Sequence, residues 1–379
     1  MPRLLYITTI ELSVRAGLIP FARYFRANGW EVDAMAKNVT VSPDCAAEFD
    51  RLWEVDWSRN PAHPRNLLSA PATVARVVQE RQYDLVHVHT PVAAFVSRFA
   101  LRGRPAGASP RVVYTAHGFH FHPGGHPLRN RAFEALERMA GHWTDYLVAI
   151  NNTDFDSARR LSLLPDNRIR LIPGIGIDRQ RFSPQSITET QVRQVRRELK
   201  IPDGAAVFTM AAEFIPRKRH RDLLEAFRQL GAVNAILVLP GSGRDLQKMK
   251  DLAETLGIAA RVRFPGFRKD MPVLTKASIA TILCSEQEGL PLAVIESLSL
   301  GVPVIGTNIR GTADLLQPGC GIKVPVGSPA HLAEAMLWMM SNPNSVAAMS
   351  ALARCSSAPY DQNNILAMHR DLYAEALAS

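Results

Sequence analysis

The feature that most constrains this chain is the regular alternation of short apolar or β-branched runs with longer helical patterns. In the first half the runs are 4–8, 31–36, 85–89, 112–116, 146–150 and 169–172, and in the second half they are 207–211, 235–239, 262–264, 279–284, 303–306 and 321–324. Strands that alternate with helices form parallel sheets covered by helices on both faces. We therefore expect an α/β protein.

The alternation pauses once, in a loop-like stretch that runs from Pro173 to Pro184. A chain of 379 residues also suits two domains better than one. We expect one Rossmann-like domain over residues 1–183 and a second over 184–355, facing a central cleft. After a break near Pro359, residues 356–379 are predicted to form a helix that returns to the N-terminal domain.

Composition excludes several classes of protein. Hydrophobic residues make up 47% of the chain and charged residues 21%, which is typical of globular proteins and not of disordered ones. The 4 cysteines form no CxxC pair, which indicates a reducing compartment. No apolar run reaches the roughly 18–20 residues of a membrane span. We expect a cytoplasmic protein, with peripheral attachment to the inner face of the plasma membrane as an open alternative.

The net charge of +9 leaves the binding partner open. A basic face suits nucleic acid, anionic lipid or a phosphorylated substrate, and it is equally typical of a plain solvated surface.

The segment from Ser285 to Glu296 is the first motif with chemical content. It follows a predicted strand, contains Gly289 and Pro291, and leads into a helix with Gly301 as its stop signal. A helix N-terminus at the end of a strand is suited to a phosphate. Glu296 lies about a turn and a half inside the helix, where it could accept hydrogen bonds from ribose hydroxyls. Two solvated helix glutamates are the simpler alternative.

A histidine and a basic turn follow two other predicted strands. His117 comes directly after the run 112–116, at the sheet edge where α/β proteins bind ligands, although a strand-end histidine is often structural. His87 and His89 are interpreted as structural. Arg217 and Lys218 follow a proline between a strand and a helix, where they could neutralise a diphosphate or simply face solvent.

Two further patterns are interpreted as structural. Asp154 and Asp156 form a DxD pattern of the kind that binds metals, but the preceding Asn151 indicates helix capping. The Gly241–Gly243 turn lacks the Lys-Ser/Thr of a P-loop. No His/Cys cluster has zinc-binding spacing, so we expect neither a metal nor another cofactor.

Taken together, these segments resemble the family 4 glycosyltransferases of the GT-B fold, and among them the bacterial exopolysaccharide and capsule enzymes. The glutamate segment matches the family's E-x7-E signature. The other matching segments are TAHGFHF (Thr115–Phe121), VHVHTP (Val86–Pro91), SRNP…N (Ser58–Asn66), IPGIGID…F (Ile172–Phe182), VRFPGFRKDM (Val262–Met271) and GVPVIGTNIRGTADLL (Gly301–Leu316). The resemblance spans nearly the whole chain, with the motifs in the family's order.

The resemblance implies metal-independent transfer of a sugar from a nucleoside-diphosphate donor with retention of configuration. It also implies roles for individual residues. His117, Glu288 and Lys218 are expected at the reacting centre, and the donor-binding residues are expected to be Gly17, Arg217, Lys218, Gly266, Phe267, Glu288, Gly289, Leu290, Leu292 and Glu296. Gly17 is placed in a loop after the first strand, where its backbone would approach the phosphates.

The sequence departs from the family pattern at two places. Glu213 stands where many members have Arg, which removes one expected phosphate contact unless Arg217 replaces it. The N-terminal segment offers only Gly17 where a double glycine is common.

Similar proteins extend lipid-linked sugars at the cytoplasmic membrane face. Two basic patches in the first half could therefore contact a lipid pyrophosphate or anionic lipid, one containing Arg102 and Arg104 and the other Arg129 and Arg131. A buried helix with a solvated basic end is the structural alternative.

The sequence thus predicts a retaining hexosyltransferase that uses a nucleotide-sugar donor, expected to be a UDP-sugar. Its expected acceptor is a saccharide, with a polyprenyl-pyrophosphate-linked form favoured, in surface polysaccharide biosynthesis. No nucleic-acid partner is expected. A sugar-nucleotide epimerase of the same fold and a non-catalytic nucleotide-sugar-binding protein remain as alternatives.

Overall fold

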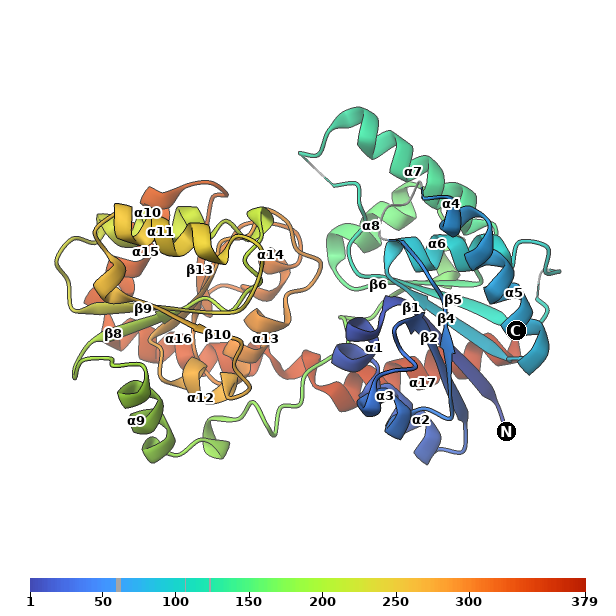
Figure 1. Cartoon of the computed structure of the whole chain (residues 1–379), viewed down its shortest axis with the longest axis horizontal. Helices are drawn as coiled ribbons and strands as arrows, with labels where there is room; N and C mark the ends of the chain where they lie inside the picture. The colour runs from blue at the N-terminus through green and yellow to red at the C-terminus, as the bar shows by residue number, and fades with distance from the viewer. Residues whose placement is uncertain (59–62, 106, 123) are drawn as a thin grey trace. The chain divides into compact units, whose positions relative to one another are not determined.

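The computed structural model describes residues 1–58, 63–105, 107–122 and 124–379. Its chain divides into two compact units, Met1–Ile175 with Asn363–Ser379 and Gly176–Gln362 (Figure 1). The first unit therefore contains both chain ends, and the expected junction at residue 183 falls inside the second unit. The outgoing and returning segments pair at the boundary, where Ile177 N donates to Tyr360 O at 2.9 Å and Gln362 N donates to Ile177 O at 3.0 Å.

The first unit is built on a seven-stranded sheet of order β3-β2-β1-β4-β5-β6-β7, in which neighbouring strands are parallel. Its strands are β1 (Arg3–Ile10), β2 (Glu31–Lys37), β3 (Arg51–Glu54), β4 (Leu85–His89), β5 (Arg111–Ala116), β6 (Tyr146–Ala149) and β7 (Ile169–Leu171). Its helices are α1 (Glu11–Gly17), α2 (Ile19–Ala27), α3 (Pro43–Glu48), α4 (Pro64–Leu67), α5 (Ser69–Arg81), α6 (Pro91–Ala100), α7 (Pro127–Gly141), α8 (Asn152–Arg160) and the 3-10 turn η1 (Asp166–Arg168), joined by α17 (Gln362–Ala378) from the other end of the chain.

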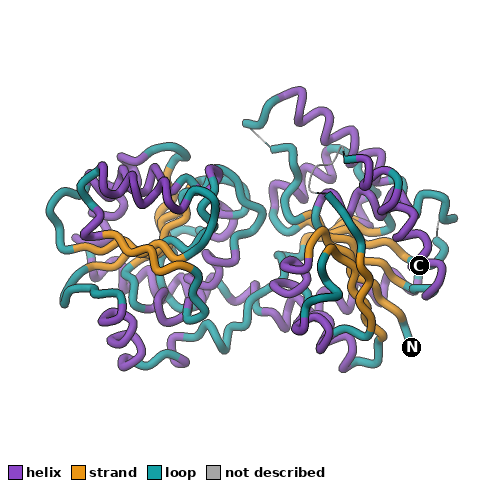
Figure 2. Tube along the Cα trace, in the orientation of Figure 1, coloured by secondary structure: helices purple, strands orange, loops and turns teal. Residues whose placement is uncertain are grey.

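The second unit has a six-stranded parallel sheet of order β10-β9-β8-β11-β12-β13 (Figure 2). Its strands are β8 (Ala206–Thr209), β9 (Ala235–Pro240), β10 (Val262–Gly266), β11 (Ala280–Leu283), β12 (Val304–Thr307) and β13 (Gly321–Val324). Its helices are α9 (Glu189–Glu198), α10 (His220–Gln229), α11 (Leu246–Thr255), α12 (Met271–Lys276), α13 (Leu292–Ser299), α14 (Thr312–Leu315), α15 (Pro329–Ser341) and α16 (Pro343–Ser356), with 3-10 turns η2 (Pro184–Ser186), η3 (Pro216–Lys218), η4 (Ala259–Arg261) and η5 (Ala358–Tyr360).

Both sheets are buried on both faces. Successive strand residues point to opposite faces, and in β8 the neighbours Val207 and Phe208 belong to different hydrophobic clusters. In β1 the same separation holds for Leu5 and Tyr6. This packing explains why the strands appear in the sequence as continuous apolar runs rather than as alternating patterns, and it confirms the predicted class of two parallel α/β domains.

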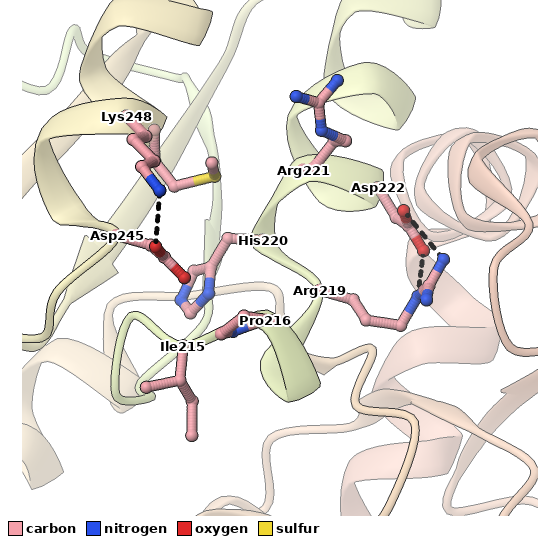
Figure 3. Close-up of a pocket in the computed structure, with 9 residues that line it drawn as sticks. Ile215, Pro216, Arg219, His220, Arg221, Asp222, Asp245 and Lys248 are labelled. Atoms are coloured by element: carbon pink, nitrogen blue, oxygen red, sulfur yellow. Dashed lines mark hydrogen bonds and ion pairs between the residues drawn. The ribbon is translucent and has the colours of Figure 1, made fainter.

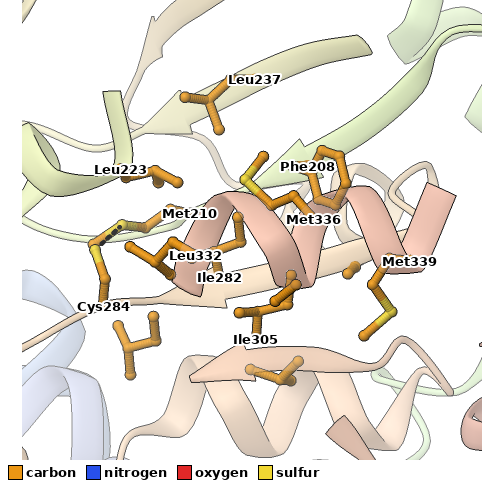
Figure 4. Packing of buried hydrophobic residues seen from close by; sticks show 14 of the residues in the cluster. Phe208, Met210, Leu223, Leu237, Ile282, Cys284, Ile305, Leu332, Met336 and Met339 are labelled. Carbon is orange, nitrogen blue, oxygen red and sulfur yellow. Dashed lines mark hydrogen bonds between the residues drawn. The ribbon is translucent and has the colours of Figure 1, made fainter. Parts of the chain in front are cut away.

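Helix α15 shows how one face of the second sheet is covered. Leu332, Met336 and Met339 lie at helical spacing and are all buried. Figure 4 shows Met336 beside Phe208, and these residues are at most 2% exposed. Full burial of such a side chain contributes roughly 1.5–3 kcal/mol, so this face is a major source of the unit's stability.

The predicted C-terminal helix is confirmed as a part of the first unit. Ile365, Leu366 and Tyr373 of α17 are buried in one cluster with β1 residues such as Tyr6.

The sequence analysis missed the edge strand β3, because its four residues are exposed or only partly buried and carry no apolar run.

Candidate functional site

Each sheet has one point at which the strand order reverses. In the second unit it lies between β8 and β11, and in the first between β1 and β4. The carboxyl ends of parallel strands share one edge, and ligands of open α/β sheets bind at that edge next to the reversal.

The turn after β8 carries the expected basic residues of the second unit. Pro216 opens the 3-10 turn η3, and Arg219 ends it in the left-handed region with a φ of 54°. Glu286 N donates to Arg217 O at 3.0 Å, which attaches this turn to the loop that follows β11. The two loops on either side of the reversal point are therefore held together.

An ion pair lies where the two loops meet. The Lys218 Nζ atom is 2.5 Å from Glu288 Oε1, and Arg217 Nη1 is 3.5 Å from Glu288 Oε2. Glu288 is only 8% exposed, so solvent screens its charge weakly. The structure thus brings together three of the residues that the sequence singled out.

A third loop supports the glutamate loop from the side of β12. Thr307 Oγ1 donates to Ser285 O at 2.6 Å, and Arg310 Nε donates to Glu288 O at 3.2 Å. Gly311 has a φ of 75°, and a Cβ built on it would lie 1.9 Å from Gly289 O. Only glycine allows this approach. Arg310 and Gly311 both lie in the segment GVPVIGTNIRGTADLL, which matched the family, but the sequence analysis assigned no role to Arg310.

Helix α13 places its N-terminus at the same edge. It begins at Leu292 after Pro291 and is followed by Gly301 at a φ of 68°, close to the expected start and stop. The first N–H groups of a helix have no partner within it, so the start of α13 at Leu292 and Ala293 presents donors suited to an anion.

Glu296 lies inside α13 and is partly buried. Among the residues that the structure describes, its carboxylate has no hydrogen-bond or ion-pair partner. Burial raises the pKa of the Glu296 carboxyl to about 7, and the positive charge of Arg181 opposes this shift. A buried, unpaired carboxyl is unfavourable in the free protein and available to hydroxyl donors of a ligand.

The turn after β10 exposes an aromatic ring. Gly266 adopts a φ of 74°, and the next side chain, Phe267, is 78% exposed. Arg268 fixes the turn through ion pairs of 2.6 Å to both Glu198 and Asp270. A rigid turn that holds an aromatic ring in solvent is suited to stacking on a planar ligand.

A pocket of about 320 Å³ opens beside η3, but neither Lys218 nor Glu288 lines it (Figure 3). His220 lines it, with its ring stacked on Phe214 at 4.2 Å, and burial lowers the pKa of His220 to about 4. Its charged neighbours are paired within the pocket, Arg219 with Asp222 at 2.6 Å and Lys248 with Asp245 at 3.4 Å. The pocket lies away from the helix N-terminus of α13, whereas the Lys218–Glu288 pair lies where the two loops at the reversal point meet.

In the first unit, histidines occupy the carboxyl ends of β4 and β5. His117 follows β5 and is exposed, whereas His89 ends β4 and is 4% exposed. His89 Nδ1 and His117 Nε2 lie 2.9 Å apart and share a hydrogen bond. At the reversal point itself, the hydroxyls of Thr9 and Thr90 hydrogen-bond at 2.7 Å. The sequence singled out His117 and treated His89 as structural, although both lie at the carboxyl ends of strands.

Gly17 does not lie in a loop, so this expectation is wrong. It is the last residue of α1, and a Cβ built on it would meet Ile175 Cδ1 at 3.2 Å. The segment Glu11–Gly17 contains good helix formers, and it starts a helix directly after β1. The glycine therefore serves close packing inside the first unit.

The first basic patch is mostly committed to structure. Arg104 is 10% exposed and pairs with Asp145 at 2.7 Å, and Asp145 also accepts from Val112 N at 2.7 Å. These contacts lie at the amino end of β5, because α6 runs back along the sheet, and thus at the edge opposite His117. Arg102 is exposed and stacks on Phe99 at 3.9 Å. Neither position suits an acceptor at the carboxyl edge, contrary to expectation.

The second basic patch is exposed on α7, which follows β5. Arg129 and Arg131 lie in its first turns and are exposed. Three exposed apolar residues accompany them along the helix, Leu128 at 69%, Leu136 at 41% and Met139 at 43%. An exposed apolar stripe beside arginines is typical of surfaces that bind a partner.

The structure supports the reading of the DxD segment as a helix cap. Asn151 is the N-cap of α8, and its side chain accepts from Asp154 N at 2.8 Å. Over residues 1–58, 63–105, 107–122 and 124–379, no group of three or more His, Cys, Asp or Glu side chains is arranged to hold a metal ion. In the same ranges, no helix has both the length and the apolar character needed to cross a membrane. Residues 59–62 of the SRNP…N segment lie outside the described residues.

Comparison with known proteins gives matches over both units. The profile of "Glycosyltransferase Family 4" matches residues 18–181, and that of "Glycosyl transferases group 1" matches residues 191–355. The chain is 29% identical to EpsD of Bacillus subtilis over 377 residues, which covers 98% of this chain and 96% of EpsD.

An enzyme of Escherichia coli named UDP-Gal:alpha-D-GlcNAc-diphosphoundecaprenol alpha-1,3-galactosyltransferase is 29% identical over 247 residues, or 64% of this chain and 62% of that enzyme. Among solved structures, HepE of Anabaena in complex with UDP and glucose matches with a TM-score of 0.81 at 19% identity, over 99% of this chain and 100% of that one. At that identity the likeness shows the shared GT-B fold.

Proposed function

Because the chain belongs to the family 4 glycosyltransferases and is a transferase of the GT-B fold, we propose that it moves a sugar from a UDP-sugar to a lipid-linked saccharide acceptor. The transfer retains the anomeric configuration and serves the assembly of a surface polysaccharide. The observation that carries the proposal is the Lys218–Glu288 ion pair at the reversal point of the second sheet, beside the N-terminus of α13.

The donor's diphosphate fits this edge by charge. Lys218 and Arg217 supply cationic groups, and the first residues of α13, Leu292 and Ala293, supply backbone donors. When a diphosphate binds, its oxygens replace Glu288 as partners of Lys218, and the Glu288 carboxylate turns to the sugar hydroxyls. Glu296 then accepts from the ribose hydroxyls, and Phe267 flanks the base.

Transfer breaks the bond between the anomeric carbon and the terminal phosphate oxygen and forms a bond from that carbon to the acceptor oxygen. Negative charge develops on the departing diphosphate, where Lys218, Arg217 and the α13 N-terminus stabilise it. The acceptor's proton passes to the departing phosphate on the same face of the sugar. His117 hydrogen-bonds a hydroxyl or phosphate oxygen at the reacting centre.

The names of two similar proteins support the choice of substrates. The Escherichia coli relative is named for UDP-galactose and for an acceptor linked to diphosphoundecaprenol. HepE was solved with UDP and glucose. The matched profiles describe glycosyl transferases, so the epimerase and the non-catalytic binding protein receive no support.

Contact with an anionic membrane surface is assigned to α7. At 100° per residue, Leu128, Leu136 and Met139 fall within one arc of about 80°, with Arg129 about 20° beyond one border and Arg131 about 60° beyond the other. Basic residues at the borders of an apolar arc suit a helix that lies in the headgroup region, where it can present the carboxyl edge of the first unit to a lipid-linked sugar.

The experiment measures free nucleoside diphosphate released from UDP-, GDP- and ADP-sugars, with and without a polyprenyl-pyrophosphate-linked sugar. We expect release from a UDP-sugar that rises sharply when the lipid acceptor is added. Release from a GDP- or ADP-sugar alone would overturn the donor assignment. Conversion of the sugar nucleotide to its epimer without release would replace the transferase by an epimerase.

A further inference from the structure

His117 is held by a second histidine that the proposed reaction does not use. His89 Nδ1 lies 2.9 Å from His117 Nε2, and the two ring centres are 5.2 Å apart with an interplanar angle of 35°. Because this bond occupies Nε2, only Nδ1 of His117 remains for a substrate. The orientation of the exposed ring thus depends on the buried one.

The environment of His89 determines which atom carries the shared proton. In the part of the chain that the structure describes, His89 Nε2 is buried and has no hydrogen-bond partner. A neutral imidazole has one N–H and one bare nitrogen. If His89 accepted through Nδ1, its Nε2–H would be a buried donor without an acceptor, and buried donors are left unpaired more rarely than acceptors.

The favoured arrangement therefore has His89 donating from Nδ1 and keeping a bare Nε2. His117 Nε2 accepts this proton, so the neutral His117 ring carries its own proton on Nδ1. Burial lowers the pKa of His89 well below its usual value, which keeps this ring neutral at physiological pH.

His89 is in turn fixed by a buried array of rings. His87 stacks on it with ring centres 4.1 Å apart. Both nitrogens of His87 are bonded, Nδ1 to Tyr373 Oη at 2.5 Å and Nε2 to Thr115 Oγ1 at 2.7 Å. Tyr373 Oη also lies 3.1 Å from Tyr6 Oη. The array joins α17 to β1, β4 and β5 and leaves His89 little freedom to rotate.

We propose that His89 is a positioning residue that fixes the tautomer of His117, so that His117 presents Nδ1–H to the substrate as a hydrogen-bond donor. His117 then stabilises a substrate oxygen and does not act as a general base. This agrees with transfer of the acceptor proton to the departing phosphate. The inference rests on the proposed transferase function and adds the direction of one hydrogen bond to it.

The kinetic test compares His89→Phe, which keeps a flat ring without a donor, with His89→Asn, whose amide can donate from near the place of Nδ1. We expect His89→Phe to lower kcat roughly tenfold with little change in the KM for the donor, and His89→Asn to recover most of that loss. His369→Phe is the matched control, since His369 lies in the same ring array and bonds Ile365 O at 2.9 Å instead of His117. It is expected to leave kcat unchanged.

A double-mutant cycle separates positioning from packing. In a His117→Ala background, His89→Phe is expected to cost no further activity, because its effect passes through His117. An equal loss in both backgrounds would overturn the proposal and assign His89 to the core alone.

The tautomer can also be measured in the unmodified protein, so the test does not depend on variants that fold. Long-range nitrogen–proton spectra of histidine-labelled protein are expected to show the proton of His117 on Nδ1 and that of His89 on Nδ1. A proton on Nε2 of His117 would refute the assignment whatever the protein's activity. Absence of sugar transfer by the wild type with this tautomer present would instead count against the proposed function.

Discussion

At the reversal point of the second sheet, Lys218 and Glu288 form an ion pair within reach of Arg217 and of a helix N-terminus. At the corresponding place in the first sheet, the groups are threonine hydroxyls and neutral imidazoles, and His89 is almost fully buried. The same topology thus presents charge in one unit and a few directed hydrogen bonds in the other. The first chemistry suits a diphosphate and the second suits neutral sugar hydroxyls.

The charged edge and the neutral edge also differ in how strongly ligand binding depends on exact atomic positions. A charged edge binds an anion even when positions shift slightly, because Coulomb energy falls slowly with distance. A neutral hydrogen bond is lost with small misplacement, so the first unit needs a rigid ring array behind His117. The first unit accordingly uses a helix from the far end of the chain, α17, to complete its support.

The largest effect is expected when the ion pair at the charged edge of the second unit is removed. Lys218→Ala and Glu288→Gln are each expected to lower kcat by roughly 100-fold or more, because each removes a group aimed at charge or hydroxyls in the transition state. Lys248→Ala is the control, since this lysine lies in the same unit and pairs with Asp245, away from Glu288. The measurement is acceptor-dependent release of nucleoside diphosphate. Full turnover in either site variant would remove the assignment.

A pH dependence distinguishes the carboxyl of Glu296 from the other groups. Burial raises the pKa of Glu296 to about 7 from 4.5, so the folded protein holds a proton between these values that the unfolded chain has lost. This group's contribution to stability is therefore present at acidic pH and is lost as the pH rises through about 7.

Ribose binding needs the ionised carboxylate, so the affinity for UDP should fall about tenfold for each pH unit below 7 through this group. Glu296→Gln should lack that component, and titration calorimetry of both proteins from pH 5.5 to 8 measures the difference. Identical pH profiles would show that Glu296 does not contact the nucleotide as a carboxylate.

An intermediate effect concerns the α7 surface of the first unit. Leu128→Asp combined with Met139→Asp should abolish co-sedimentation with vesicles that contain anionic lipid, because both side chains lose their apolar insertion. Arg129→Gln and Arg131→Gln should each weaken binding about fivefold, and the loss should shrink at high salt. Arg102→Gln, at the opposite sheet edge, serves as the control. Unchanged sedimentation of the aspartate variant would leave α7 without this role.

The smallest effect is expected for a change in the buried ring array that supports His117 in the first unit. Tyr373→Phe removes the hydroxyl that bonds His87 and Tyr6, and the free energy of unfolding should fall by about 1–2 kcal/mol. The control is Tyr360→Phe in the second unit, whose hydroxyl has no hydrogen-bond partner among the described residues. Denaturant unfolding measures both variants, and an equal response would show that the array adds nothing to stability.

Much of the fold could be read from local patterns. The continuous apolar runs predicted the bounds of β4 and β9 closely. A strand that is buried on both faces is mostly apolar at successive positions, so it is visible in the sequence as one run. The same logic failed for β3, which lies at the sheet edge and is mostly exposed. Gly17 was misplaced because a glycine near a strand suggests a loop, whereas here it gives α1 room to pack on Ile175.

By itself, the sequence determined the fold class, the order of the elements and the side chains available at each strand end, because periodicity and turn residues are local properties. It placed Lys218, Glu288 and His117 at those ends without showing what each touches. Tertiary structure alone decided that Arg104 is paired with Asp145, that Glu296 has no partner among the described residues and that Tyr373 supports His87 from 286 positions away in the chain. Burial and hydrogen-bond partners arise only when distant segments pack together, and they determine which of the available groups can meet a ligand.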